Sequence, residues 1–139
     1  MYSDFTCAPS SASTYDLVNT NQSFCPTDGG VIAITQPISA CSLSSAENVT
    51  VKIINYSSST TIHSTEVSYT VNGGSPVTET VSSSILAGDT LTYTFTTTAD
   101  LSIVGTYNFD AWITLSGDTN TSNDSLIGYS MEYYPTPPV

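Results

Sequence analysis

The 139-residue chain has almost no basic side chains. It contains one Lys and no Arg against 12 Asp and Glu, which gives a formal net charge of −11 at pH 7 and a pI near 4.1. A chain without a basic patch cannot neutralise the phosphates of nucleic acid or the headgroups of anionic lipids. We therefore exclude nucleic acid as a partner and expect cations to be the natural counter-species.

Long apolar runs are also absent. No stretch reaches the roughly 18 consecutive apolar residues of a membrane-spanning helix, so we expect no membrane insertion. Residues 1–6 lack the basic region and the apolar stretch of a signal peptide, which indicates that a signal was already removed or that Met1 is an added initiator. The single Lys, the 23 Ser and 23 Thr, and the three Cys favour an extracellular or cell-surface location.

The residues that enzymes use are scarce as well. One His, one Lys and no glycine-rich phosphate loop leave little from which to pair a nucleophile with a base. His63 falls in a Ser/Thr-rich loop, which is typical of a solvated side chain. Paired carboxylates can hydrolyse glycosides, but no spacing here singles out such a pair. We therefore expect a protein without enzymatic activity.

Alternation of apolar and polar residues is the dominant pattern that is present, and no stretch shows a convincing helical period. Seven strands separated by Gly, Asn, Asp and Ser turns predict an all-β fold, a seven-stranded immunoglobulin-like antiparallel β-sandwich, with a small barrel as the alternative. Asn72-Gly73-Gly74 predicts a hairpin turn between two of these strands. The expected strands are 31–35, 48–56, 66–71, 77–81, 91–95, 106–115 and 125–134.

Three segments follow from this pattern. Residues 31–134 form the predicted sandwich, and residues 135–139 form a proline-rich tail. Residues 1–30 are an irregular N-terminal extension, which we interpret either as a linker or as an arm that docks on a neighbouring subunit as an added strand.

Several short stretches also resemble a known family. They are ISACSL at 38–43, AENVTV at 46–51, VSYTVNGG at 67–74, LAGD at 86–89, TFT at 94–96, GTY at 105–107, and GDTN at 117–120 with ND at 123–124. Through these stretches, residues 29–130 resemble the CARDB-like modules, the cell-adhesion-related, immunoglobulin-like domains of secreted and surface proteins. The resemblance implies adhesion or scaffolding rather than catalysis. The family usually occurs as tandem repeats, whereas this chain has one copy, so we expect repetition by self-assembly.

Acidic residues gather at one end of the predicted sandwich. Successive connections alternate between the two ends, which places several oxygen-bearing side chains at the same end. Calcium takes six to eight oxygen ligands, and a short loop of alternating Asp and Asn offers several of them. We expect calcium there, with the alternative that Asp and Asn are present because turns favour them. The candidate ligands are Asp28, Asp89, Asp118, Asn120, Asn123 and Asp124.

An exposed aromatic group is a second candidate site. Trp112 and Asp110 fall on the strand face opposite the predicted core stripe, and Tyr133 and Tyr134 are candidates for the same use. An exposed Trp marks an interface or a platform on which glycans stack, unless another part of the chain covers it.

The three Cys leave one thiol over. A strand advances about 3.3 Å per residue, so the strand 31–35 carries Cys41 to the end opposite the extension. We expect Cys7 to pair with Cys25, or an extension Cys to pair with Cys41 of a neighbouring subunit.

Two functions follow. The first is a non-enzymatic extracellular structural subunit that self-assembles head to tail into a filament or tube, with calcium at its acidic end. The alternative is a carbohydrate-binding or adhesion module of a larger secreted protein.

Overall fold

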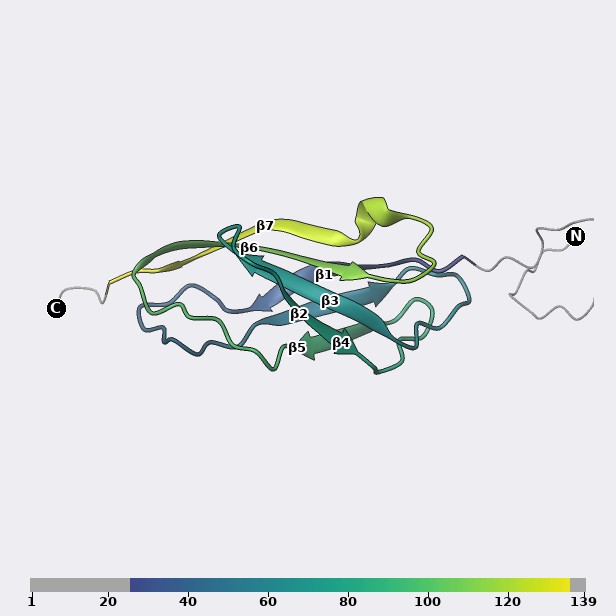
Figure 1. Ribbon diagram of the computed structural model, residues 1–139, viewed down its shortest axis with the longest axis horizontal. Coiled ribbons are helices and arrows are strands. Elements are labelled where there is room, and N and C mark those ends of the chain that lie inside the picture. Colours follow the sequence, from purple (N-terminus) through teal and green to yellow (C-terminus); the bar gives the residue numbers. More distant parts are fainter. Residues whose placement is uncertain (1–25, 136–139) are drawn as a thin grey trace, which may run out of the picture.

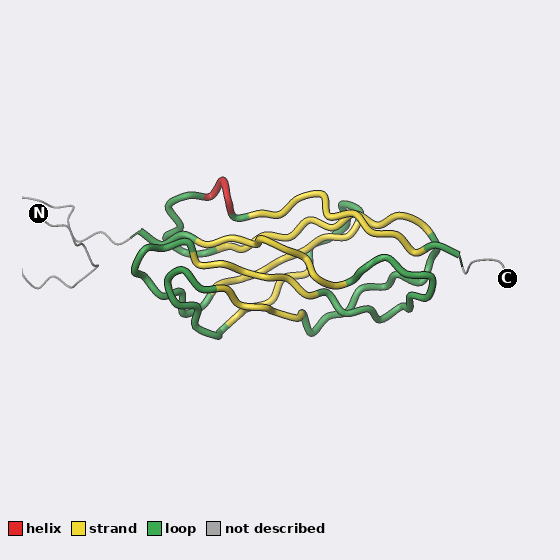
Figure 2. The backbone as a smooth tube through the Cα atoms, turned by 180° about the vertical axis from the view of Figure 1, so that it is seen from behind, coloured by secondary structure: helices red, strands yellow, loops and turns green. Residues whose placement is uncertain are grey.

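The computed structural model describes residues 26–135. Seven strands form two antiparallel sheets that pack face to face, with strand order β1-β2-β5 in one and β4-β3-β6-β7 in the other (Figures 1 and 2). The predicted all-β, immunoglobulin-like sandwich is confirmed. The strands are β1 (Gly29–Gln36), β2 (Thr50–Asn55), β3 (Thr65–Val71), β4 (Val77–Val81), β5 (Thr90–Thr94), β6 (Gly105–Thr114) and β7 (Ser125–Tyr133), and the short 3-10 helix η2 is Thr121–Asn123.

The apolar stripes of the strands build one core between the sheets. Val49, Val51 and Ile53 were expected on one face and are fully buried, as is Phe109 of β6. Tyr69 of β3 joins the layers, since its ring contacts Phe95 edge-on at a centroid distance of 4.7 Å. Both sheets therefore contribute large side chains to the core, which is the pattern of a sandwich.

The first strand begins earlier than the sequence pattern predicted. Gly29 and Gly30 belong to β1 rather than to the extension, and Thr27 already forms a bridge with Asp118. A Cβ on Gly30 would lie 2.1 Å from the carbonyl oxygen of Asn123. The two glycines thus allow close approach of another segment rather than a break in the strand.

The predicted hairpin joins β3 to β4. Asn72 and Gly73 have positive φ values of 52° and 72°, as a tight hairpin turn of the type I′ class requires. β3 and β4 then pair in register from Thr65 with Val81 to Tyr69 with Val77.

One edge of the sandwich is closed, where β1 lies beside β7. The N–H of Val31 donates to the carbonyl of Asp124 at 3.1 Å. After a cis peptide between Gln36 and Pro37, the chain crosses to the second sheet, and Ala40 forms a parallel bridge with Tyr133. The N–H of Ala40 donates to the carbonyl of Glu132, and the N–H of Tyr134 donates to that of Ala40, both at 3.1 Å.

β4 and β5 form the opposite, open edge. Glu79 points inward from β4 and accepts from the hydroxyls of Tyr93 (2.8 Å) and Thr96 (2.7 Å) and from the N–H groups of Thr96 and Thr97 (2.9 Å each). Burial alone would raise the pKa of Glu79, but these donors outweigh it and lower that pKa to about 2. Glu79 therefore clamps one sheet to the other.

The chain enters at one end of this elongated sandwich and leaves at the other (Figure 1). We call the first end, with residues 26–29 and 116–124, the N-terminal pole. The second, with residues 99–105 and 133–135, is the C-terminal pole. Within residues 26–135, no helix is long and apolar enough to cross a membrane.

Candidate functional site

The loop after β6 is tied to the segment that leads into β1. Thr119 donates to the carbonyl of Thr27 from its N–H (2.9 Å) and from its hydroxyl (3.2 Å). The N–H of Gly29 donates to Oδ2 of Asp118 at 3.1 Å. These contacts bring Asp28 beside the loop, so the predicted grouping of acidic residues depends on bonds between segments about 90 residues apart.

Two of the candidate ligands are engaged within the loop. The N–H of Asn120 donates to Oδ1 of Asp118 at 2.7 Å. Oδ1 of Asn120 accepts from the hydroxyl of Ser122 at 2.6 Å and caps η2. This arrangement is the ordinary use of Asp and Asn in turns, and it takes up the side-chain oxygen of Asn120.

Three other side-chain oxygens at this pole have no hydrogen-bond partner among residues 26–135. They are Oδ1 of Asp28, Oδ1 of Asn123 and Oδ1 of Asp124, and each of these atoms is buried. Buried polar atoms are nearly always paired, and an unpaired one costs about 1–3 kcal/mol. Three such oxygens at one pole are the clearest sign of an unmet requirement in residues 26–135.

The ionised form of the Asp124 carboxyl group is disfavoured at this pole. Burial, the charge of Asp118, a hydrogen bond with Asp118 and the charge of Asp28 together raise its pKa to about 6. Three acidic groups therefore share one place without a compensating base. The single Lys of the chain, Lys52, lies in the middle of β2, so a cation from solution is what would relieve the repulsion.

The carboxylates at this pole could bind a cation that prefers oxygen ligands only together with other oxygen donors. Among residues 26–135, no group of three or more His, Cys, Asp or Glu side chains could hold a metal by itself. A cation here would need the amide oxygen of Asn123, backbone carbonyls and water beside the carboxylates, which is the mixture that calcium accepts.

Asp89 and His63 lie outside this cluster. The carbonyl of Asp89 accepts from the N–H of Asn55 at 3.0 Å, which places it at the same pole. Its carboxylate is not among the groups that shift the pKa of Asp124. Nδ1 of His63 lies 3.3 Å from the hydroxyl of Ser84 in an exposed position, as expected for a solvated loop His.

Trp112 lies far from the tyrosine candidates. Trp112 pairs with Ser68 and with Ser125 and is partly buried on the outward face, whereas Tyr133 pairs with Gly105 at the other end of β6. Seven residues along a strand correspond to about 23 Å. Trp112 and Tyr133 therefore cannot form one platform.

Asp110 and Tyr134 make structural contacts instead. Oδ1 of Asp110 accepts from the N–H of Gly128 at 2.8 Å, across the irregular register between β6 and β7. Tyr134 is exposed and joins Ala40 through its backbone N–H.

Cys41 lies next to Ala40 at the C-terminal pole, the end predicted for it. It is partly buried and forms no disulfide with another residue of 26–135. Cys7 and Cys25 lie outside the described residues, so the pairing remains a prediction.

Comparison with known proteins bears on the fold. No protein-family model matches the sequence, and no curated protein does. A solved structure matches: the CARDB domain of the PF1109 protein from Pyrococcus furiosus, in complex with di-metal ions. It is 20% identical, the alignment covers 87% of this chain and 99% of that chain, and the TM-score is 0.53. The chain therefore has the fold of a CARDB domain.

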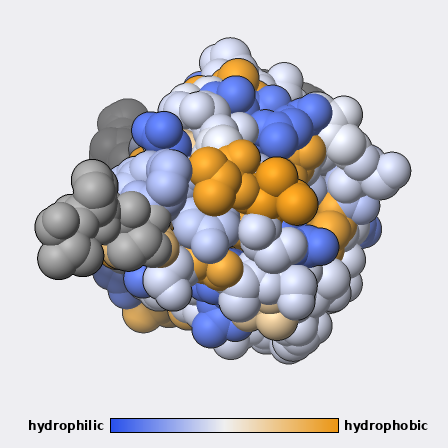
Figure 3. Space-filling view, turned by 90° about the vertical axis from the view of Figure 1, so that its left-hand side faces the viewer, coloured by the Kyte–Doolittle hydropathy of each residue, from blue (hydrophilic) through white to orange (hydrophobic). Residues whose placement is uncertain are grey.

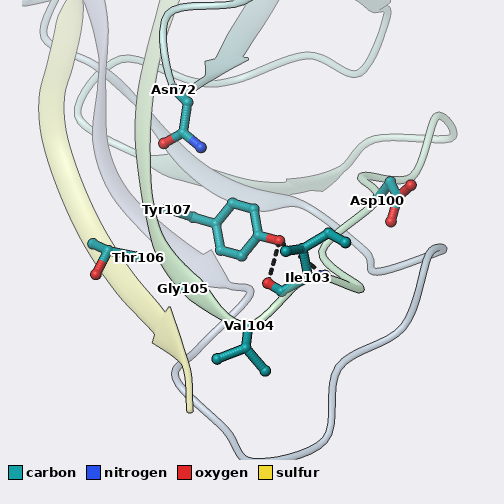
Figure 4. A pocket seen from close by; sticks show the side chains of 7 residues that line it. All are labelled: Asn72, Asp100, Ile103, Val104, Gly105, Thr106 and Tyr107. Atoms are coloured by element: carbon teal, nitrogen blue, oxygen red, sulfur yellow. Dashed lines mark hydrogen bonds between the residues drawn. The ribbon is translucent and has the colours of Figure 1, made fainter. Parts of the chain in front are cut away.

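The C-terminal pole of the sandwich is shaped by a tyrosine that sequence analysis did not single out. The hydroxyl of Tyr107 donates to the carbonyl of Ile103 at 2.7 Å and accepts from its N–H at 3.2 Å (Figure 4). This is the tyrosine corner of immunoglobulin-like sandwiches. The signal was a Tyr close to the start of β6, after Gly105.

The same corner presents apolar side chains to solvent. Ile103 is 72% exposed and Val104 is 50% exposed, and Figure 3 shows hydrophobic residues gathered on this end of the sandwich. They line an open pocket of about 320 Å³ together with Asn72 and Asp100, at the lower limit of small-molecule sites.

Proposed function

We propose that the chain is a non-enzymatic, extracellular structural module of the adhesion type, which joins end to end into a filament or tube and holds calcium at its N-terminal pole. The observation that carries the proposal is the set of three buried, unpaired oxygens on Asp28, Asn123 and Asp124. A bound cation would satisfy them all and would remove the repulsion that raises the pKa of Asp124.

Calcium is the cation that fits this donor chemistry. The donors are carboxylate and amide oxygens, with no nitrogen or sulfur ligand among them, and hard divalent ions prefer such oxygens. Calcium also tolerates irregular geometry, whereas magnesium demands a near-ideal octahedron. The di-metal ions bound to the Pyrococcus furiosus CARDB domain, which shares the fold, lend further support.

End-to-end joining is supported by the path of the chain. The described part of the chain begins before β1 at one pole and ends after β7 at the other (Figure 1). Copies in series would therefore extend in one direction and form a heterologous contact, which gives rings or open filaments. A cation held by Asp28 lies where the chain enters the sandwich and would stiffen that junction.

Thermal unfolding in millimolar calcium and in chelator tests the calcium site. We expect calcium to raise the midpoint of the wild type, because a ligand at about 100 times its Kd adds about 2.7 kcal/mol to the free energy of unfolding. Asp124→Asn should lose this response. In chelator at pH 7 it should unfold at a higher temperature than the wild type, because it removes a carboxylate whose ionisation is disfavoured in the folded state.

Asp100→Asn is the matched control, since it makes the same charge change at an exposed position on the C-terminal pole. It should keep the calcium response in full. An unchanged wild-type midpoint, or an equal response from Asp124→Asn, would overturn the calcium site. Negative-stain microscopy tests assembly separately: dispersed monomers both with calcium and with chelator would refute end-to-end joining.

A further inference from the structure

Among residues 26–135, β5 is an edge strand of its sheet, and it lacks the features that normally protect such an edge. Its sequence Thr90-Leu91-Thr92-Tyr93-Thr94 has no charge, no Pro and no irregular register with β2. Natural edge strands usually carry a Lys, a Pro or a bulge, because their unpaired backbone groups are a template for another strand. Thr90, Thr92 and Thr94 are also exposed.

The backbone of these three threonines faces outward. Antiparallel ladders alternate between hydrogen-bonded and non-hydrogen-bonded pairs. At the two ends of β5, the Phe95 N–H donates to the Val49 carbonyl (2.9 Å) and the Asn55 N–H donates to the Asp89 carbonyl (3.0 Å). These two bonds determine which residues of β5 form hydrogen-bonded pairs with β2. Leu91 and Tyr93 therefore bond to β2, and Thr90, Thr92 and Thr94 direct their N–H and C=O groups to the free edge.

The strand has a pattern that is symmetric about Thr92, with threonine at positions 90, 92 and 94 and a large apolar or aromatic residue at 91 and 93, so it is complementary to a second copy of itself. We propose that β5 is a self-pairing edge: two copies of the chain join antiparallel through β5 about a twofold axis at Thr92, which fuses two three-stranded sheets into one of six strands. Thr92 then exchanges both backbone hydrogen bonds with Thr92 of the second copy, and Thr90 does the same with Thr94.

The side chains match in this register. Leu91 of each copy lies opposite Tyr93 of the other on the inner face, in a non-hydrogen-bonded position where side chains are closest. Both are only partly buried in the single chain, although they pack against the core, so pairing would cover them. The outer face pairs threonine with threonine, and both kinds of cross-strand pair are favourable.

β4, the edge strand of the second sheet on the same open side, carries a charge that disfavours self-pairing, whereas β5 does not. β4 is a true palindrome, Val77-Thr78-Glu79-Thr80-Val81, but the same self-pairing would place Glu79 opposite Glu79. Like charges directly opposite each other are destabilising, and an inward-pointing charge is a known device against edge pairing. The contrast between the two edges singles out β5.

Sedimentation of the full chain from about 10 µM to about 1 mM tests the pairing, since that range spans weak association. We expect a monomer–dimer equilibrium that strengthens with salt, because each copy carries a net charge of −11. Thr92→Lys should weaken the dimer at least tenfold, because it places two ammonium groups opposite each other on the axis.

Thr80→Lys on β4 is the matched control. It is exposed and lowers the net charge by the same amount, so general electrostatics should affect both variants alike, and Thr80→Lys should dimerise at least as well as the wild type. Hydrogen exchange gives a second readout: the Thr92 amide should be protected at high concentration and should lose that protection on dilution. A wild type that stays monomeric at about 1 mM in high salt, or equal weakening by both variants, would overturn the proposal.

Discussion

Glu79 offers a direct measure of how strongly the two sheets are joined. Glu79→Gln keeps the size of the side chain but replaces one acceptor oxygen with an NH₂ group that faces donors. A pKa lowered from 4.5 to about 2 corresponds to about 3 kcal/mol of preference for the ionised form. Because the side chain is partly exposed, water screens part of this, and we expect a loss of about 2 kcal/mol.

The effect has a definite pH dependence. The folded-state pKa of Glu79 lies below its unfolded value, so its contribution is fully present above about pH 5 and is lost as pH falls from about 4.5 to about 2. Urea denaturation at pH 7 should therefore show the full difference in free energy of unfolding between wild type and Glu79→Gln. Thermal unfolding at the same pH should show a midpoint that is lower by roughly 5–10 °C in Glu79→Gln. Near pH 2 the two proteins should have the same stability.

Glu66→Gln is the control for this experiment. Glu66 lies on neighbouring β3, is exposed, and loses the same charge on substitution. It should change the free energy of unfolding by less than about 0.5 kcal/mol. Equal losses in Glu66→Gln and Glu79→Gln, or a Glu79→Gln difference that persists unchanged at pH 2, would refute the clamp.

Two further predictions concern the poles. Tyr107→Phe removes the hydroxyl that bonds both backbone groups of Ile103 and should lower the free energy of unfolding, measured in urea, by about 1–3 kcal/mol. Tyr56→Phe, at an exposed ring, is the control and should have no effect. Equal losses in the two variants would contradict a stabilising role of the Tyr107 hydroxyl. Gly30→Ala would place a Cβ 2.1 Å from the carbonyl oxygen of Asn123 and should cost about 1–3 kcal/mol. A Gly30→Ala protein as stable as the wild type would contradict the close approach there.

Much of the fold was predictable because alternation directly reports which strand face is buried. The stripe Val49, Val51 and Ile53 and the hairpin at Asn72-Gly73 were both expected and are both present. The start of β1 was misplaced because glycine favours turns, and nothing local reveals that Asn123 lies against Gly30.

The candidate metal site was predictable only in part. Topology brings Asp28 and Asp124 to one pole, but it does not determine where each side chain points. Asn120 caps η2, and Asp89 contributes a backbone carbonyl to its neighbour. An inward-facing acid on an alternating strand was the available signal for Glu79, although its partners 14 to 18 residues away could not be inferred.

The closed edge determines how the module resists a pulling force. β1 and β7 lie side by side and run in the same direction, and the chain enters before one and leaves after the other. Tension on the two ends therefore drags these strands past each other in opposite directions, and the bonds Val31–Asp124, Ala40–Glu132 and Tyr134–Ala40 are loaded in shear together. The lifetime of the module under load is governed by its unfolding rate. That rate is then set by these three hydrogen bonds along the closed edge rather than by the size of the hydrophobic core.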